Sequence, residues 1–183
     1  MVLRIDVIPA TAADRVTVEH LYQFYVYDFT GFKSWDVGPD GRFVDAGLDG
    51  CWTEDDRRPF LVRVDGELAG FAIVDGYSHL TGERRISTIA DFFVLRRYRR
   101  LGVGEHVARE LFDRFPGRWE VAQLAENTVA QAFWRRVIDR YTGGRFTEVQ
   151  WDDDRWRGPV QTFDNTPKDH APACVLRGGS GVL

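Results

Sequence analysis

Cysteine is scarce in this 183-residue sequence, and no long apolar run occurs. Only Cys51 and Cys174 are present, far apart in the chain, and we expect reduced structural thiols and no disulfide framework. No apolar stretch approaches the roughly 20 residues that are needed to cross a bilayer. The first residues also lack the layout of a signal peptide. The sequence therefore predicts no membrane segment and a cytoplasmic location.

The sequence also has fewer basic residues than acidic ones, 24 against 28. The formal net charge is −4 at pH 7, whereas domains that bind nucleic acids are usually basic, so we expect no nucleic-acid partner. The histidines show no metal-ligand spacing and no pairing with cysteine, so we expect no metal site. With 44% hydrophobic residues, the chain has the length and composition of one globular domain. We assign residues 1–166 to this domain and 167–183 to a C-terminal tail.

The most informative stretch runs from residue 86 to residue 115. Residues 86–94 are rich in β-branched and aromatic side chains, which predicts a strand. After the basic segment 96–100, apolar residues recur at helical spacing at Val103, Val107, Ala108, Leu111, Phe112 and Phe115. A strand that enters a helix through glycines leaves backbone N–H groups unpaired at the positive end of the helix dipole. Such a turn suits a phosphate, and Arg99 and Arg100 add positive charge.

The spacing of the glycines restricts which phosphate ligand fits. A dinucleotide fingerprint would need a third glycine where Val107 stands, and the Gly-Lys-Ser/Thr of a triphosphate-binding loop is absent. What remains is Arg-x-x-Gly-x-Gly at residues 99–104, after Asp-Phe-Phe-Val at 91–94. This motif resembles that of the GNAT superfamily of acyl-CoA-dependent N-acyltransferases, and in particular its small-amine and polyamine branch. The alternative is a glycine turn that closes an ordinary corner between strand and helix.

The order of predicted elements agrees with that resemblance over about residues 3–165. We expect strands at 3–8, 59–64, 67–77, 86–94, 119–124, 145–151 and 160–164, and helices after Thr11, over 102–115 and after Asn127. Residues 31–50 are predicted to form a loop or a broken second helix. The fold class is α/β: a GNAT fold with a mixed, mostly antiparallel sheet flanked by helices, with splayed central strands.

The resemblance implies acetyl-CoA as cosubstrate. Its diphosphate would lie against the backbone amides of Arg99, Arg100, Leu101, Gly102, Val103, Gly104 and Glu105. The splayed strand would leave backbone groups of Phe93 and Val94 free for the pantetheine arm. A family segment that reads Asn-x-x-Ala-x-x-Leu-Tyr and surrounds the thioester corresponds here to Asn127, Ala130, Phe133 and Trp134.

Trp134 departs from the family pattern. The tyrosine that the family often has there protonates the leaving thiolate, and an indole N–H does not release a proton near neutral pH. Trp134 is therefore either a neighbour of the thioester or part of the core. We assign the acid role to Tyr141, with Tyr98 and water as alternatives.

An acceptor amine must lose a proton before it can attack, because an alkylamine with a pKa near about 10 is mostly charged at neutral pH. Asp91 is the candidate base, although the acid that the polyamine branch usually has one position earlier is Ala90 here. The alternative is a structural carboxylate at the strand end. With no positioned Cys/His nucleophile pair, we expect direct transfer without a covalent acyl-enzyme.

The segment from residue 28 to residue 56 is rich in acids and has only Lys33 and Arg42 to balance them before Arg57. It is either a solvated surface or a wall that attracts a cationic amine. We predict that Tyr25 and Asp28 contact the substrate, and that the protein is an N-acetyltransferase acting on a small cationic amine. The alternatives are a protein or peptide amine, an amino acid, an aminoglycoside, or a non-catalytic acyl-CoA-binding domain. The sequence is compatible with a homodimer.

Overall fold

A computed structural model describes residues 3–43 and 48–167 of the chain. The predicted tail lies outside the described residues apart from residue 167, and so does Cys174. The elements are β1 (Ile5–Pro9), the 3₁₀ turn η1 (Ala12–Asp14), α1 (Arg15–Phe29), α2 (Gly50–Thr53), β2 (Arg57–Val64), β3 (Glu67–Tyr77), β4 (Arg84–Val94), the 3₁₀ turn η2 (Arg96–Tyr98), α3 (Val103–Arg114), β5 (Arg118–Ala122), α4 (Thr128–Thr142), β6 (Thr147–Asp152) and β7 (Arg157–Asp164). None of the helices within these described ranges is long and apolar enough to span a bilayer.

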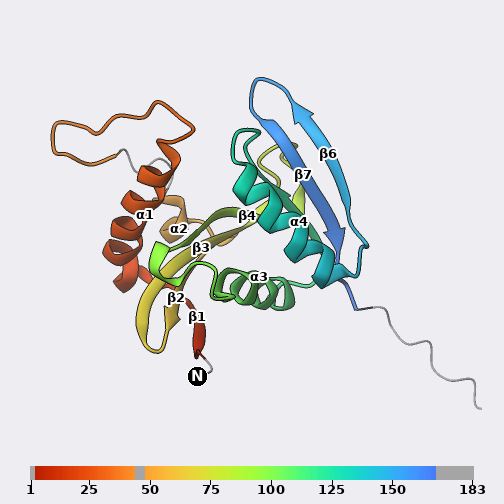
Figure 1. Ribbon diagram of the computed structural model, residues 1–183, viewed down its shortest axis with the longest axis horizontal. Helices are drawn as coiled ribbons and strands as arrows, with labels where there is room; N and C mark the ends of the chain where they lie inside the picture. Colours follow the sequence, from red (N-terminus) through yellow and green to blue (C-terminus); the bar gives the residue numbers. More distant parts are fainter. Residues whose placement is uncertain (1–2, 44–47, 168–183) are drawn as a thin grey trace, which may run out of the picture.

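The strands form one seven-stranded sheet in the order β1-β2-β3-β4-β5-β7-β6 (Figure 1). Every neighbouring pair is antiparallel except β4 and β5, which run parallel. The parallel pair arises because α3 connects β4 to β5 as a crossover helix. The predicted mixed, mostly antiparallel sheet flanked by helices is confirmed.

The two faces of the sheet carry separate cores. Helices α1 and α2 cover one face, where Val18, Leu21 and Cys51 pack against apolar side chains of β2, β3 and β4. Helices α3 and α4 cover the other face, where Val107, Leu111 and residues of α4 pack against all five strands from β1 to β5 and against Phe163 of β7. A strand presents alternate residues to its two faces, so Phe92 and Phe93 of β4 belong to different cores.

Local signals in the sequence account for several element boundaries. The hairpin of β2 and β3 turns at Asp65 and Gly66, whose φ angles of 51° and 86° suit an Asp-Gly turn. Asp14 accepts hydrogen bonds from the backbone N–H and the hydroxyl of Thr11, each at 2.9 Å. This predicted helix start forms η1, and the regular helix α1 begins only at Arg15. Between residues 31 and 50 the described part is a loop, and the short helix α2 begins at Gly50.

Strands β4 and β5 pair over only three positions, from Ile86 to Thr88 of β4. Beyond Thr88, β4 continues for six residues to Val94, hydrogen-bonded to β3 alone. The predicted splay of the central strands is therefore present. We call the unpaired edge of β4 from residue 89 to residue 94, together with the end of β5, the open edge.

Phe112 is the centre of the larger core. Its ring is fully buried and lies 4.8 Å from that of Trp119, 5.0 Å from Tyr141 and 4.9 Å from Phe163. These contacts join α3 to α4, β5 and β7, and thus hold α3 in place below the open edge.

We expect Phe112→Ala to lower the free energy of unfolding by about 3–5 kcal/mol, because it removes a fully packed ring and leaves a cavity. Urea denaturation measures the change. Val149→Ala on β6 is the control, because that side chain is 52% exposed and its loss should change stability by less than about 0.5 kcal/mol. Equal stability of the two variants would contradict the central place of Phe112.

Candidate active site

The backbone of β4 offers hydrogen-bonding groups to the open edge at alternate residues. A bulge at Ala90 shifts the register, since Ile73 of β3 faces Asp91 whereas the next residue, Val74, faces Ile89. The carbonyl oxygen of Phe93 points toward β3, because it lies 2.0 Å from where a Cβ of Gly70 would be. Since backbone groups alternate sides along a strand, those of Phe92 and Val94 face the open edge.

The structure therefore places the two residues predicted to contact the pantetheine arm differently. Val94 faces the open edge, but the backbone of Phe93 is turned to β3, and the residue that shares the open side is Phe92. The Val94 carbonyl already accepts a hydrogen bond from Nε of Arg99 at 2.6 Å. Backbone groups face the same side of a strand at every second residue, so counting back two residues from Val94 could have identified Phe92 from the sequence. The sequence does not show the bulge at Ala90, where this alternation is interrupted.

The start of α3 has free backbone donors. Gly102 precedes the helix with φ 82°, a left-handed conformation that side chains rarely adopt. The first hydrogen bond of the helix is the one that the N–H of His106 donates to the Gly102 carbonyl, at 3.0 Å. Within the described chain, no hydrogen bond is donated by the backbone N–H groups of residues 101–105. These amides lie at the positive end of the helix dipole and can hold an anion.

The two glycines of this turn, Gly102 and Gly104, are required for different reasons. Nothing lies within 4 Å of a Cβ built on Gly102, so its glycine is required by conformation. A Cβ on Gly104 would come within 3.2 Å of the Phe133 ring, so the glycine there lets α4 pack against the first turn of α3. Leu101 is exposed at the tip of the turn, Val103 is buried below it, and Glu105 pairs with Arg140 of α4 at 3.0 Å.

The arginines of the turn do not act together. Arg100 is exposed and has a positive φ of 62°, as a residue at a sharp turn. Arg99 is instead folded back: besides bonding Val94, its guanidinium binds the Asp28 carboxylate of α1 and lies 5.5 Å over the Phe93 ring. Arg96 pairs with the same carboxylate at 2.7 Å. Arg99 thus fixes the turn to α1, and Arg100 is left as the exposed cation.

Asp28 was predicted to bind the amine, and the structure does not support a free carboxylate there. Its burial alone would raise the pKa, but the hydrogen bonds from Arg99 and Arg96 hold the pKa of Asp28 below its ordinary value of 3.8. Two other acids of the acidic segment are also paired with arginines, Asp49 with Arg15 and Asp56 with Arg84. An uninterrupted acidic wall is therefore absent from the described part of this segment.

The predicted thioester segment lies at the N-terminal half of α4. Asn127 caps the helix, since its Oδ1 accepts from the N–H of Ala130 at 3.0 Å. Phe133 lies beside Gly104 and 6.0 Å from Phe92, so this segment does meet the start of α3 and the open edge. Trp134 is buried and packs edge-on against Phe92 at 4.9 Å, which makes it part of the core.

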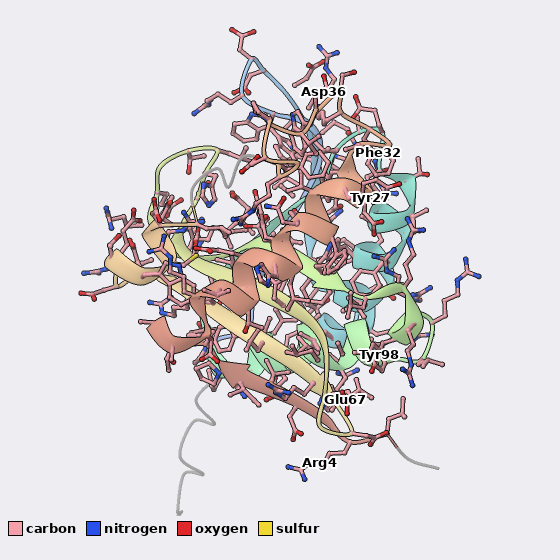
Figure 2. All side chains as sticks on the ribbon, turned by 90° about the vertical axis from the view of Figure 1, so that its left-hand side faces the viewer. Arg4, Tyr27, Phe32, Asp36, Glu67 and Tyr98 are labelled. Carbon is pink, nitrogen blue, oxygen red and sulfur yellow. The ribbon has the colours of Figure 1, made fainter. Side chains whose placement is uncertain are left out.

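Tyr141 is not brought to this site. It lies seven residues after Trp134, about 10 Å further along α4. Its hydroxyl donates to Asp113 at 2.7 Å and accepts from Asn165 at 3.0 Å, at the far end of α3. The prediction that Tyr141 supplies the proton therefore lacks support from its position. Tyr98, the other tyrosine considered, lies in η2 beside the basic turn (Figure 2).

Asp91 and Tyr25 come together on the α1 face of the sheet. The Tyr25 side chain lies next to the Asp91 carboxylate, close enough for each group to shift the pKa of the other, and Asp91 lies just after the bulge. Burial raises the pKa of Asp91 to about 6, against the opposing effects of Tyr25 and of Arg57. Burial and the neighbouring carboxylate likewise raise the pKa of Tyr25 well above 10. A carboxyl that titrates near neutrality beside an open strand edge can accept a proton from a substrate.

A second buried carboxylate close to Asp91 went unnoticed in the sequence. Asp75 of β3 is fully buried and accepts hydrogen bonds from Nε of Arg57 at 3.2 Å and from His79 at 2.6 Å. In the described part of the chain the thiol is that of Cys51, which is buried; burial raises its pKa to about 11, so it stays protonated near neutral pH. This agrees with the expected absence of a covalent acyl-enzyme on this cysteine.

A family model described as "Acetyltransferase (GNAT) family" matches residues 18–138, which include β4, α3 and most of α1 and α4. The chain belongs to this family. It is accordingly an N-acetyltransferase, and its cosubstrate is acetyl-CoA. No curated protein sequence matches the chain.

Solved structures share the GNAT fold at low sequence identity. The ribosomal-protein-S18-alanine N-acetyltransferase from Escherichia coli is 13% identical with a TM-score of 0.60, over 91% of this chain and 97% of the other. An acetyltransferase from Thermus thermophilus is 20% identical with a TM-score of 0.60, over 87% and 96%. YncA from Salmonella typhimurium, solved with its cofactor acetyl-CoA, is 16% identical with a TM-score of 0.59, over 93% and 99%.

Asp28→Asn tests the anchoring of the basic turn in this GNAT protein. We expect the free energy of unfolding of the variant to be about 1 kcal/mol lower than that of the wild type at pH 7, because partly exposed ion pairs contribute about that much. The folded-state pKa of Asp28 is lowered, so the difference from wild type should be present above pH 3.8 and vanish as the pH falls through the folded-state value. Denaturation with urea, which keeps ionic strength low, measures both; a difference that persists in acid would contradict the pairing.

Proposed function

We propose that this acetyltransferase transfers the acetyl group of acetyl-CoA directly to the amine of a small cationic substrate, with Asp91 as general base. The observation that supports this most is the pair of Tyr25 and Asp91 beside the open edge of β4, on the sheet face opposite α3. The proposal separates the two ligands by the sheet: the nucleotide at the start of α3, the amine on the α1 face.

The residues at the start of α3 fit the diphosphate of acetyl-CoA. Five consecutive backbone N–H groups from residue 101 to residue 105 have no partner in the described chain, and Arg100 is exposed beside them. This is the arrangement that binds phosphate at a helix start. The backbone groups of Phe92 and Val94 face the open edge and would pair with the amides of the pantetheine arm, which requires Arg99 to release the Val94 carbonyl.

Acetyl-CoA supplies the acetyl group as a thioester with a thiol leaving group. Asp91, when ionised, takes the proton that the ammonium of the acceptor must lose before its nitrogen can attack. The Tyr25 ring, which lies beside Asp91, covers one side of the carboxylate. The N–H of Val94 faces the same open edge and would stabilise negative charge on the thioester oxygen. Trp134 is buried in the core and cannot supply a proton to the leaving thiolate. Water is the proton source that fits this site best.

Asp91→Asn should lower kcat by about 10²–10⁴-fold while acetyl-CoA affinity stays unchanged, because an amide cannot accept the proton. In the wild type, kcat/KM should rise with pH through about 6, since Asp91 acts in its ionised form. This rise of kcat/KM with pH should be missing from the variant. Steady-state pH–rate profiles with a small amine measure it.

Glu67→Gln is the control for this removal of one negative charge. Glu67 is exposed at the start of β3, and Figure 2 shows it at the opposite end of the molecule from Phe32. This control should keep the wild-type profile. An Asp91→Asn variant with the same pH dependence as wild type would remove Asp91 as the base. Tight acetyl-CoA binding without turnover of any amine would instead favour a non-catalytic acyl-CoA-binding domain.

Gly102→Val should weaken acetyl-CoA binding at least about tenfold, because a β-branched residue is strained at φ 82° and would reorient the amides of the turn. Gly82→Val is a matched control: Gly82 has φ 74°, also with nothing within 4 Å, in the turn between β3 and β4. Both variants should lose similar stability. Calorimetry that gives both the same acetyl-CoA affinity would contradict the assignment of the phosphate site.

A further inference from the structure

A row of aromatic rings extends along α1 from Asp91. Its inner member is Tyr25, which lies beside the Asp91 carboxylate. One turn further along the same helix face, the Phe29 ring lies 4.6 Å from that of Tyr25. The same Tyr25 ring packs edge-on against Phe93 of β4 at 6.1 Å. The row therefore begins at the proposed base and is fixed to the sheet there.

The outer members of the row lie beyond the end of α1 and are open to solvent. Phe32 packs edge-on against Phe29 with centroids 6.1 Å apart, and Trp35 stacks on Phe29 at 6.3 Å with the ring planes inclined by 12°. Phe32 is 37% exposed and Trp35 is 48% exposed. Figure 2 shows Phe32 at the C-terminal end of α1, on the side of the loop that carries Asp36. Large exposed rings that continue a buried row commonly mark a binding surface.

The charges near the row suit one ammonium group better than several. Asp91 is the carboxylate at the inner end, whereas Asp28, one residue before Phe29, is bound by both Arg96 and Arg99. A polyamine with a second ammonium group near Asp28 would meet two guanidinium groups and no free carboxylate. The surface beyond Asp91 is thus aromatic; Asp28 beside it is paired with two arginines, and the next acid, Asp36, is exposed after Trp35 at the outer end of the row.

We propose that Tyr25, Phe29, Phe32 and Trp35 bind the body of the acceptor, and that the acceptor is a primary monoamine carrying an aromatic ring. This inference rests on the proposed function, because it places the amine at Asp91 and the ring against Phe32 and Trp35. Aromatic rings stack or meet edge-on with a gain beyond the burial of their area, so they discriminate in favour of an aromatic body. The predicted small cationic amine is thereby narrowed to an arylalkylamine.

The test compares kcat/KM for 2-phenylethylamine, ethylamine and spermidine. The wild type should prefer 2-phenylethylamine to ethylamine by about tenfold or more, as one aromatic contact allows. Trp35→Ala should reduce that ratio about tenfold with little change for ethylamine, and Trp35→Phe should restore most of it. Phe24→Ala is the matched control, because Phe24 is on the same helix, 57% exposed, and outside the row.

Spermidine as the best acceptor of the wild type, or an unchanged ratio in Trp35→Ala, would overturn the inference and leave the proposed function standing. If no amine is acetylated although acetyl-CoA binds, the proposed function fails, and equilibrium binding of 2-phenylethylamine in the presence of CoA decides the inference. A Kd about tenfold weaker in Trp35→Ala than in Phe24→Ala would support the aromatic site. Equal Kd values would show that the row only packs the fold.

Discussion

The site depends on the loss of pairing between β4 and β5 beyond Thr88. From Ile86 to Thr88, β4 is paired with β5 on the side that later becomes the open edge. After the bulge at Ala90, one side of β4 has no strand partner, so Phe92 and Val94 present their N–H and C=O groups there. The same bulge places Asp91 on the α1 face next to this edge. Two irregularities of β4, its early separation from β5 and its bulge against β3, thus provide the proposed edge for the acyl carrier and the position of the proposed base.

The arginine-rich turn has a structural role as well as a charge. Arg99 uses Nε for the Val94 carbonyl and its terminal nitrogen for Asp28, two acceptors that a lysine could not satisfy in a fixed geometry. By tying the turn to α1, Arg99 connects the proposed nucleotide site to the sheet face on which the acceptor is proposed to bind. Binding of the pantetheine arm at Val94 would compete with this contact, so the unliganded turn holds the edge with its own side chain.

Local chemistry made much of the fold predictable. The Asp65-Gly66 turn, the Asn127 cap and Gly102 before α3 each act through neighbouring residues, and the strands and helices that they bound were predicted from the sequence. What could not be predicted depends on pairs far apart in the chain. Asp28 meets arginines 68 and 71 residues away, and Tyr141 is held by Asp113 and Asn165, so neither side chain is free for the role its sequence position suggested. The bulge at Ala90, which turned Phe93 inward, likewise follows from pairing with β3.

The central claim is that backbone amides at the start of α3 hold the diphosphate of acetyl-CoA. Amide chemical shifts, followed by NMR during titration with acetyl-CoA and with acetylpantetheine, which lacks the diphosphate, test it most directly. The amides of Gly102, Val103, Gly104 and Glu105 should shift strongly with acetyl-CoA alone, whereas that of Val94 should respond to both compounds. Equal responses of the four α3 amides to the two compounds, or no response to either, would contradict the claim.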